Sequence, residues 1–167
     1  GEFHQCLDRA ITLIELAVVL TIIGLIIGGI LIGTSMIRSS EIQSVLGESA
    51  KFTQAIKSFQ DKYQALPGDF DGATAIWGEA DADPETCITT VGTTETATCN
   101  GDGNSRIANL DDYDVTYYEE YRAWQHLSNA KLIEGSFSGI ATTPPHEFAI
   151  GTDIPASRLT GAGWKVM

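Results

Sequence analysis

The chain has 167 residues, of which 43% are hydrophobic and 19% are charged, and its formal net charge is −12. This length fits one domain, or one domain with an appendage, and the 17 glycines without a period exclude collagen. Residues 69–120 hold 13 acidic side chains against one basic residue, Arg106. Such a surface repels phosphate backbones, so we expect no nucleic-acid partner. Two interpretations of it stay open, a solvated acidic surface and a surface that binds cations.

The apolar residues are concentrated near the N-terminus. Between Ile11 and Ile37 the only ionisable side chain is Glu15. As a helix, this segment spans roughly 40 Å, which is enough to cross the hydrocarbon core of a bilayer. A cleaved secretory signal is the competing interpretation, but its apolar region would be shorter, about 7–15 residues, and would end at a small-residue cleavage site. We therefore expect residues 11–37 to be a retained transmembrane helix.

A short motif surrounds the start of this segment. Residues 9–16 read RAITLIEL and residues 17–24 read AVVLTIIG. This signature resembles that of the type IV pilins and type II secretion pseudopilins. The resemblance implies that a prepilin peptidase cuts between Ala10 and Ile11 and that Ile11 is then N-methylated. Thr12 and Gly24 also match family positions, whereas Ala10 replaces the usual Gly and Ile11 the commoner Phe.

Glu15 is unusual because a carboxylate inside an apolar segment costs several kcal/mol in lipid unless it is paired or neutralised. A headgroup-level position is one interpretation, but apolar residues lie on both sides of Glu15. The resemblance implies a partner, the free N-terminal amine of a neighbouring subunit in a filament core. A buried pair of this kind fixes register more than it adds net stability.

Glycines at positions 24, 28, 29 and 33 form two small-xxx-small pairs, Gly24 with Gly28 and Gly29 with Gly33. Such pairs allow apolar helices to approach closely. The alternative is that these are tolerated glycines of a membrane helix. Many members of the family have a helix-kinking proline where this chain has Ile32, so the usual kink is not expected.

The pattern changes after the apolar segment. Apolar residues recur at helical spacing on one face, with polar residues between them, until Pro67 and Gly68 stop the helix. The apolar positions of this face are Ile42, Val45, Leu46, Phe52, Ile56 and Phe59. We therefore expect an amphipathic helix over residues 38–65 that packs against a globular, acidic head over residues 66–167.

The expected fold is α+β. The long N-terminal helix leaves its apolar half protruding and packs its amphipathic half against a small antiparallel β-sheet head, the lollipop arrangement of pilins. A second helix is predicted over residues 124–133, ended by Gly135. Residues 1–10 read as a partial leader peptide, and the apolar phrase at residues 163–167 suggests a head truncated at its C-terminus.

Two features of the head concern covalent bonding and metal binding. Cys87 and Cys99 lie 12 apart without a CxxC partner, which favours a disulfide in an oxidising compartment over two reduced thiols. An acidic loop has the oxygen-ligand spacing of a calcium-binding EF-hand, without its turn glycine and bidentate Glu. Its candidate Ca²⁺ ligands are Asn100, Asp102, Asn104, Asp111 and Asp112. A metal-free, Asx-rich turn is the other interpretation of this loop.

No catalytic motif is present in the sequence, and neither His126 nor His146 belongs to a recognisable arrangement with a nucleophile or base. We therefore expect no enzymatic activity and no required cofactor. The first hypothesis is a filament subunit of a type IV pilus or type II secretion pseudopilus, assembled from copies of itself by Glu15, Thr12, Gly24 and Gly28. Its other partners would be the prepilin peptidase and methyltransferase and the inner-membrane assembly machinery.

This hypothesis places the chain in the bacterial inner membrane before assembly, and afterwards in a periplasmic or cell-surface filament. The second hypothesis is a monomeric, membrane-anchored extracytoplasmic binding module, with calcium or an acid-tolerant molecule as its ligand. The sequence does not decide between a pilus and a pseudopilus. N-methyl-isoleucine at position 11 would separate the two hypotheses, because only a processed filament protein carries it.

Overall fold

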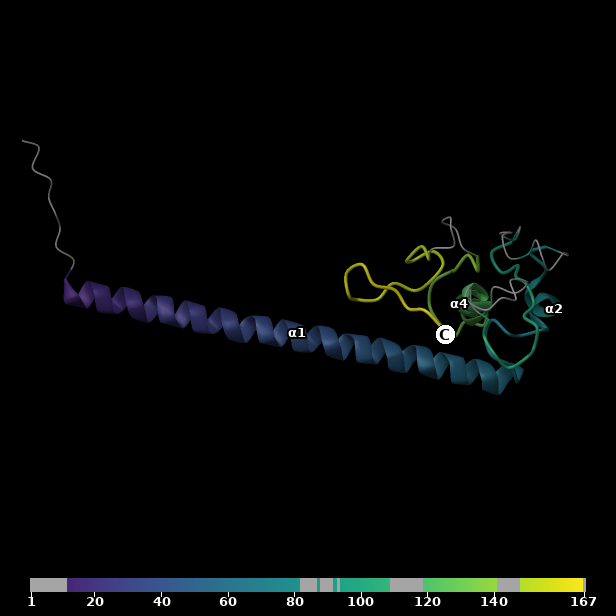
Figure 1. Cartoon of the computed structure of the whole chain (residues 1–167), viewed down its shortest axis with the longest axis horizontal. Helices are drawn as coiled ribbons and strands as arrows, with labels where there is room; N and C mark the ends of the chain where they lie inside the picture. Colours follow the sequence, from purple (N-terminus) through teal and green to yellow (C-terminus); the bar gives the residue numbers. More distant parts are fainter. Residues whose placement is uncertain are drawn as a thin grey trace, which may run out of the picture. The chain divides into compact units, whose positions relative to one another are not determined.

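The computed structural model describes residues 12–81, 87, 92, 94–108, 119–140 and 148–166. Its helices are α1 (Leu13–Tyr63), α2 (Ala73–Trp77) and α4 (Glu119–Asn129) (Figure 1). The chain divides into two compact units between Gln43 and Ser44, so α1 contributes its first part to one unit and its remainder to the other. The leader expected at residues 1–10, together with Ile11, lies outside the described residues.

The expected α+β fold is wrong. The described residues contain no β-strand and no sheet, and only three isolated bridges join pairs of residues. These bridges are Glu79 with Thr98, Ile150 with Ile154, and Ala156 with Gly163. In the described C-terminal part of the head, residues 148–166 form turns, bends and single bridges, because their glycines and proline interrupt any alternating pattern long enough to build a ladder. The head is built on helices and irregular segments.

The part of α1 within the first unit has apolar side chains on every side, and they are exposed. Leu13 is 88% exposed, Leu25 77% and Ile32 65%. α1 is long and apolar enough to cross a membrane, with a mean hydropathy of 2.8 over its most apolar 18 residues. No kinking proline interrupts it, and the helix continues through Gly28 and Gly29.

The second unit buries one face of α1. Ala55 and Phe59 are buried, and Phe52, Ile56 and Tyr63 are partly buried against the same core. The spacing of these residues, at intervals of three, four and seven, is that of one helical face. Sequence reasoning placed this face too early, because Leu46 is 64% exposed and Ile42, in the first unit, is 56% exposed.

The core of the second unit is rich in aromatic rings. The ring of Trp124 lies 5.0 Å from that of Phe52, edge to face, and Phe52 also contacts Trp164 at 5.5 Å between ring centroids. Phe59 stacks on the ring of His126 at 6.3 Å. Edge-to-face pairs of this kind contribute roughly 0.5–1.5 kcal/mol beyond the area that they bury. α1 is therefore held by aromatic packing against α4 rather than by a sheet.

The predicted second helix is present as α4 but with shifted ends. It begins at Glu119 instead of residue 124 and ends at Asn129 instead of near residue 133. The helix closes because Lys131 adopts a left-handed conformation, with φ of 61°, and the Leu132 amide donates to the Leu127 carbonyl at 3.0 Å. This is the hydrogen-bond pattern of a Schellman cap, with lysine at the position usually held by glycine.

Polar contacts hold the C-terminal segment against both helices. The Glu48 carboxylate, on α1, accepts hydrogen bonds from the Ser157 hydroxyl at 2.8 Å, the Trp164 indole at 3.1 Å and the Arg158 amide at 3.1 Å. Lys165 Nζ lies 3.0 Å from Oε2 of Glu120, a fully buried residue of α4. A buried carboxylate is tolerable only when it is paired, so Lys165 fixes this segment on α4.

Candidate functional site

The N-terminal end of α1 forms a reciprocal cap. Oε2 of Glu15 accepts hydrogen bonds from the Thr12 amide at 2.9 Å and from the Thr12 hydroxyl at 2.8 Å. The Glu15 amide donates to the Thr12 hydroxyl at 3.3 Å. This is a capping box, which satisfies amides that a helix start leaves unpaired. Sequence reasoning assigned Glu15 to assembly alone and missed this role, although the Thr-x-x-Glu spacing is its signature.

The second oxygen of Glu15, Oε1, accepts no hydrogen bond from the described residues. The carboxylate is thus satisfied on one side and open on the other. An open carboxylate oxygen beside an apolar surface can accept a cationic donor such as an amine.

The predicted glycines lie on an open surface of α1. A Cβ placed at Gly24, Gly28, Gly29 or Gly33 would meet nothing within 4 Å apart from the adjoining backbone of α1 itself. Nothing within the described structure therefore requires glycine at these four positions. Glycine in a helix interior costs roughly 1 kcal/mol relative to alanine, and the open surface fits either close packing against another helix or tolerated glycines of a membrane helix.

A second candidate site is an acidic cluster in the second unit. It consists of Asp69, which follows α1, Asp102 in a glycine-rich loop, and Glu119, the first residue of α4. One carboxylate oxygen from each lies within 4.8 Å of the others. Asp69 and Glu119 are buried, and Asp102 is exposed. Three carboxylates at this spacing have the oxygen chemistry that Ca²⁺ and Mg²⁺ prefer.

Glycines bring these three acidic residues together. Gly68 has a φ of 94°, and a Cβ there would collide with the Glu119 carbonyl. A Cβ at Gly101 would collide with the backbone of Gly68 and Asp69. The absence of side chains at these two positions therefore allows three separate backbone segments to approach one another.

Backbone amides satisfy part of the negative charge. The Asp69 carboxylate accepts from the amides of Asn104 and Ser105, each at 2.9 Å. The Glu119 carboxylate accepts from the Ala108 amide at 2.7 Å and the Asp102 amide at 3.0 Å. The two buried acids thus organise residues 102–108 through these backbone amides.

Burial nevertheless raises the pKa of Asp69, and the neighbouring Asp102 raises it further. Burial also raises the pKa of Glu119, against the opposing effect of its two amide donors. Both pKa values rise because negative charges are unfavourable when they are buried away from water and close to one another. A cation placed among the three carboxylates would remove that cost.

The structure only partly gathers the calcium ligands expected from the sequence. Asp102 lies in the acidic cluster. The amide oxygen of Asn100 instead accepts from the Thr74 amide at 2.8 Å, and that of Asn104 accepts from the Arg106 amide at 2.8 Å. Asp111 and Asp112 lie outside the described residues. Asp69 and Glu119 were missed because they are 33 and 17 residues from Asp102, and EF-hand spacing searches only within one loop.

The expected disulfide is confirmed, since Cys87 and Cys99 are bonded. Both cysteines are buried, and Nη2 of Arg122 donates to the Cys87 carbonyl at 2.6 Å. Burial lowers the pKa of Arg122 to about 10, so the guanidinium remains charged at neutral pH. The disulfide loop is therefore anchored on α4.

His126 is a packing residue in this structure. Its ring is fully buried, Nδ1 accepts from the Gly68 amide at 3.0 Å, and Nε2 lies 3.2 Å from the Cys99 carbonyl. An accepting Nδ1 and a donating Nε2 describe the neutral imidazole. Burial, with the nearby charge of Arg122, lowers the pKa of His126 to about 3. Both ring nitrogens are occupied by structural contacts.

Comparison with protein-family models, with curated proteins and with solved structures finds no match to the chain. The resemblance to pilins and pseudopilins therefore rests on residues 9–24 alone.

Proposed function

We propose that the chain is a structural subunit of a type IV pilus or type II secretion pseudopilus, which assembles through the N-terminal half of α1. The observation that carries the proposal is the open carboxylate of Glu15 at the start of a helix whose apolar side chains are exposed on every side. We assign the chain no enzymatic reaction and no nucleic-acid partner.

Residues 13–37 require an apolar environment, because their apolar side chains are exposed on α1. Before assembly, a bilayer supplies it. After assembly, equivalent helices of other copies supply it, and the open glycine positions favour their close approach. In that setting, Oε1 of Glu15 pairs with the N-terminal amine that cleavage before Ile11 releases on a neighbouring copy. We further propose that the filament lies in the periplasm or at the cell surface.

Replacing Glu15 with Gln is expected to leave membrane insertion intact and to abolish filaments. Gln keeps the hydrogen bond of the capping box, whereas it removes the charge that pairs with the amine. Loss of one partner from a buried ion pair costs about 3–5 kcal/mol, which weakens each subunit contact by roughly a hundredfold to several thousandfold. The measurement is electron microscopy of shed fibres, with flotation of membranes to confirm insertion.

Glu41→Gln is the matched control, because Glu41 is an exposed carboxylate on the same helix beyond its apolar segment. It should assemble as the unaltered chain does. Normal filaments from the Glu15→Gln variant would contradict the proposed ion pair and leave Glu15 only its capping role.

Processing gives an independent test of the same proposal. Mass spectrometry of the subunits in isolated fibres is expected to find a chain that begins at N-methyl-isoleucine 11. A native protein that retains residues 1–10 and forms no fibres would overturn the proposal in favour of a monomeric membrane-anchored module.

The acidic cluster favours calcium binding by the head as a second candidate function, compatible with either form of the protein. We propose Asp69, Asp102 and Glu119 as its ligands, in place of the single-loop set expected from the sequence. The cluster supplies negative charge at the right spacing, and its buried carboxylates have raised pKa values that a cation would offset.

Calcium at about ten times its dissociation constant is expected to stabilise the head by about 1.4 kcal/mol, which raises the melting temperature by about 3–8 °C. The test is a thermal melt of the full chain in detergent, with and without Ca²⁺. The Asp102→Asn variant should lose the shift, and Asp71→Asn, an exposed carboxylate outside the cluster, should retain it. Equal shifts in both variants, or none in the unaltered chain, would eliminate this site.

A further inference from the structure

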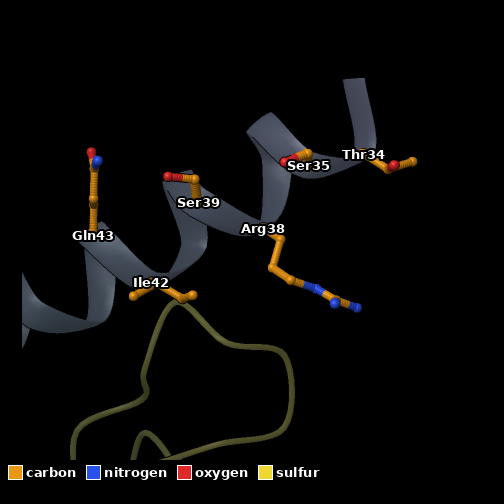
Figure 2. Close-up of a pocket in the computed structure, with 6 residues that line it drawn as sticks. All are labelled: Thr34, Ser35, Arg38, Ser39, Ile42 and Gln43. Carbon is orange, nitrogen blue, oxygen red and sulfur yellow. The ribbon is translucent and has the colours of Figure 1, made fainter. Parts of the chain in front are cut away.

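Polar residues at the C-terminal end of the apolar part of α1 and just beyond it form a surface that we call the charged collar, defined as Thr34, Ser35, Arg38, Ser39 and Gln43. Figure 2 shows these side chains with Ile42 on three successive turns of α1, and Arg38 extends away from the helix. All five residues of the collar are exposed. The Thr34 hydroxyl donates to the Leu31 carbonyl at 3.1 Å, so the helix itself already uses that group.

Arg38 is distinguished by its charge and its position. It is the only basic residue between Arg9 and Lys51 in the sequence. None of the described residues forms an ion pair with it, including Glu41 three positions along the helix. Its guanidinium is therefore an available cation with five donors at the end of an apolar helix.

The position of Arg38 in α1 fits a bilayer boundary. Residues 13–37 span roughly 37 Å as helix, slightly more than the approximately 30 Å of a hydrocarbon core. With residues 13–37 in the membrane, Arg38 lies where the hydrocarbon meets the lipid phosphates. A long basic side chain at this depth keeps its stem on the apolar side and extends its charge into the headgroups.

We propose that the charged collar binds the phosphate of a membrane lipid, with Arg38 as the phosphate ligand and Ser35, one turn earlier, as a supporting donor. The planar guanidinium donates two parallel hydrogen bonds to phosphate oxygens, which a lysine cannot do. This contact sets the depth of the helix in the bilayer. This inference rests on the membrane-anchored form in the proposed function. The contact between Arg38 and the lipid phosphate must break when a subunit leaves the bilayer for a filament.

The test uses the full chain, labelled with ¹³C in its arginine guanidinium groups, in vesicles of phosphatidylcholine and phosphatidylglycerol. An Arg9→Gln background removes the other N-terminal arginine. Solid-state NMR then measures dephasing of the guanidinium carbon by lipid ³¹P. We expect dephasing in the background chain and its loss in the Arg38→Gln variant. Arg158→Gln, which removes an arginine of the head, should keep it.

The outcomes separate this inference from the proposed function. Absent dephasing, or dephasing that survives Arg38→Gln, in a chain that floats with the vesicles overturns the lipid contact and leaves the membrane anchor standing. A chain that does not float overturns both. The same chain in phosphate-free detergent with inorganic phosphate in the buffer should give no dephasing, and a signal there would assign the contact to free phosphate instead of lipid.

Discussion

Replacing Phe59 with Ala is expected to lower the free energy of unfolding of the head by about 3–5 kcal/mol. Phe59 is fully buried and lies where α1 meets α4, stacked on His126 and 4.5 Å from the ring of Tyr63. Its removal leaves a cavity among aromatic rings that cannot close without moving α1. Since α1 has no sheet to hold it in the described head, few other contacts can compensate.

The measurement is urea unfolding of the full chain in detergent, followed by tryptophan fluorescence, because all three tryptophans lie in the head. Leu46→Ala is the matched control, as Leu46 lies on the same helix but is 64% exposed. Its effect should stay within about 0.5 kcal/mol. Equal losses in the two variants would mean that the aromatic packing against α1 does not carry the stability of the head.

The long helix α1 was more predictable than the head, for physical reasons. The long apolar segment and the periodic positions Phe52, Ile56 and Phe59 carry signals that local sequence determines. The start of the packed face was misplaced, because Ile42 and Leu46 match the period but no buried surface is available to them. Periodicity identifies the apolar face of a helix, but it does not show how much of that face is covered by the rest of the protein.

The antiparallel sheet was expected from the lollipop arrangement of pilins, and the motif at residues 9–24 carries no information about strand pairing in the head. Register and pairing of strands are non-local properties, which a local motif does not determine. The same limit applies to the acidic cluster, since Asp69 and Glu119 meet Asp102 only after α1 and α4 have packed. The bounds of α4 were difficult to predict for another reason. Its charged residues, such as Glu120 and Arg122, give the sequence pattern of an exposed helix, whereas ten of its eleven residues are buried.

Acidification is expected to destabilise the head through His126. Its pKa of about 3 in the folded chain lies well below the value of about 6.5 that applies when the chain unfolds. Between these two values the unfolded chain binds the additional proton, so the stability that neutral His126 contributes is complete above pH 6.5 and is lost as pH falls. From pH 7 to pH 5 this contribution falls by about 2 kcal/mol.

Asp69 and Glu119 act in the opposite direction. Their raised pKa values mean that the folded chain takes up protons first, so acidification relieves their repulsion and adds stability. A His126→Gln variant separates the two effects, because glutamine can accept from the Gly68 amide but does not titrate. In urea titrations at pH 7 and pH 5, the unaltered chain should lose about 2 kcal/mol more than this variant. An equal loss in both would mean that a proton reaches His126 in the folded head, which its contacts with Gly68 and Cys99 argue against.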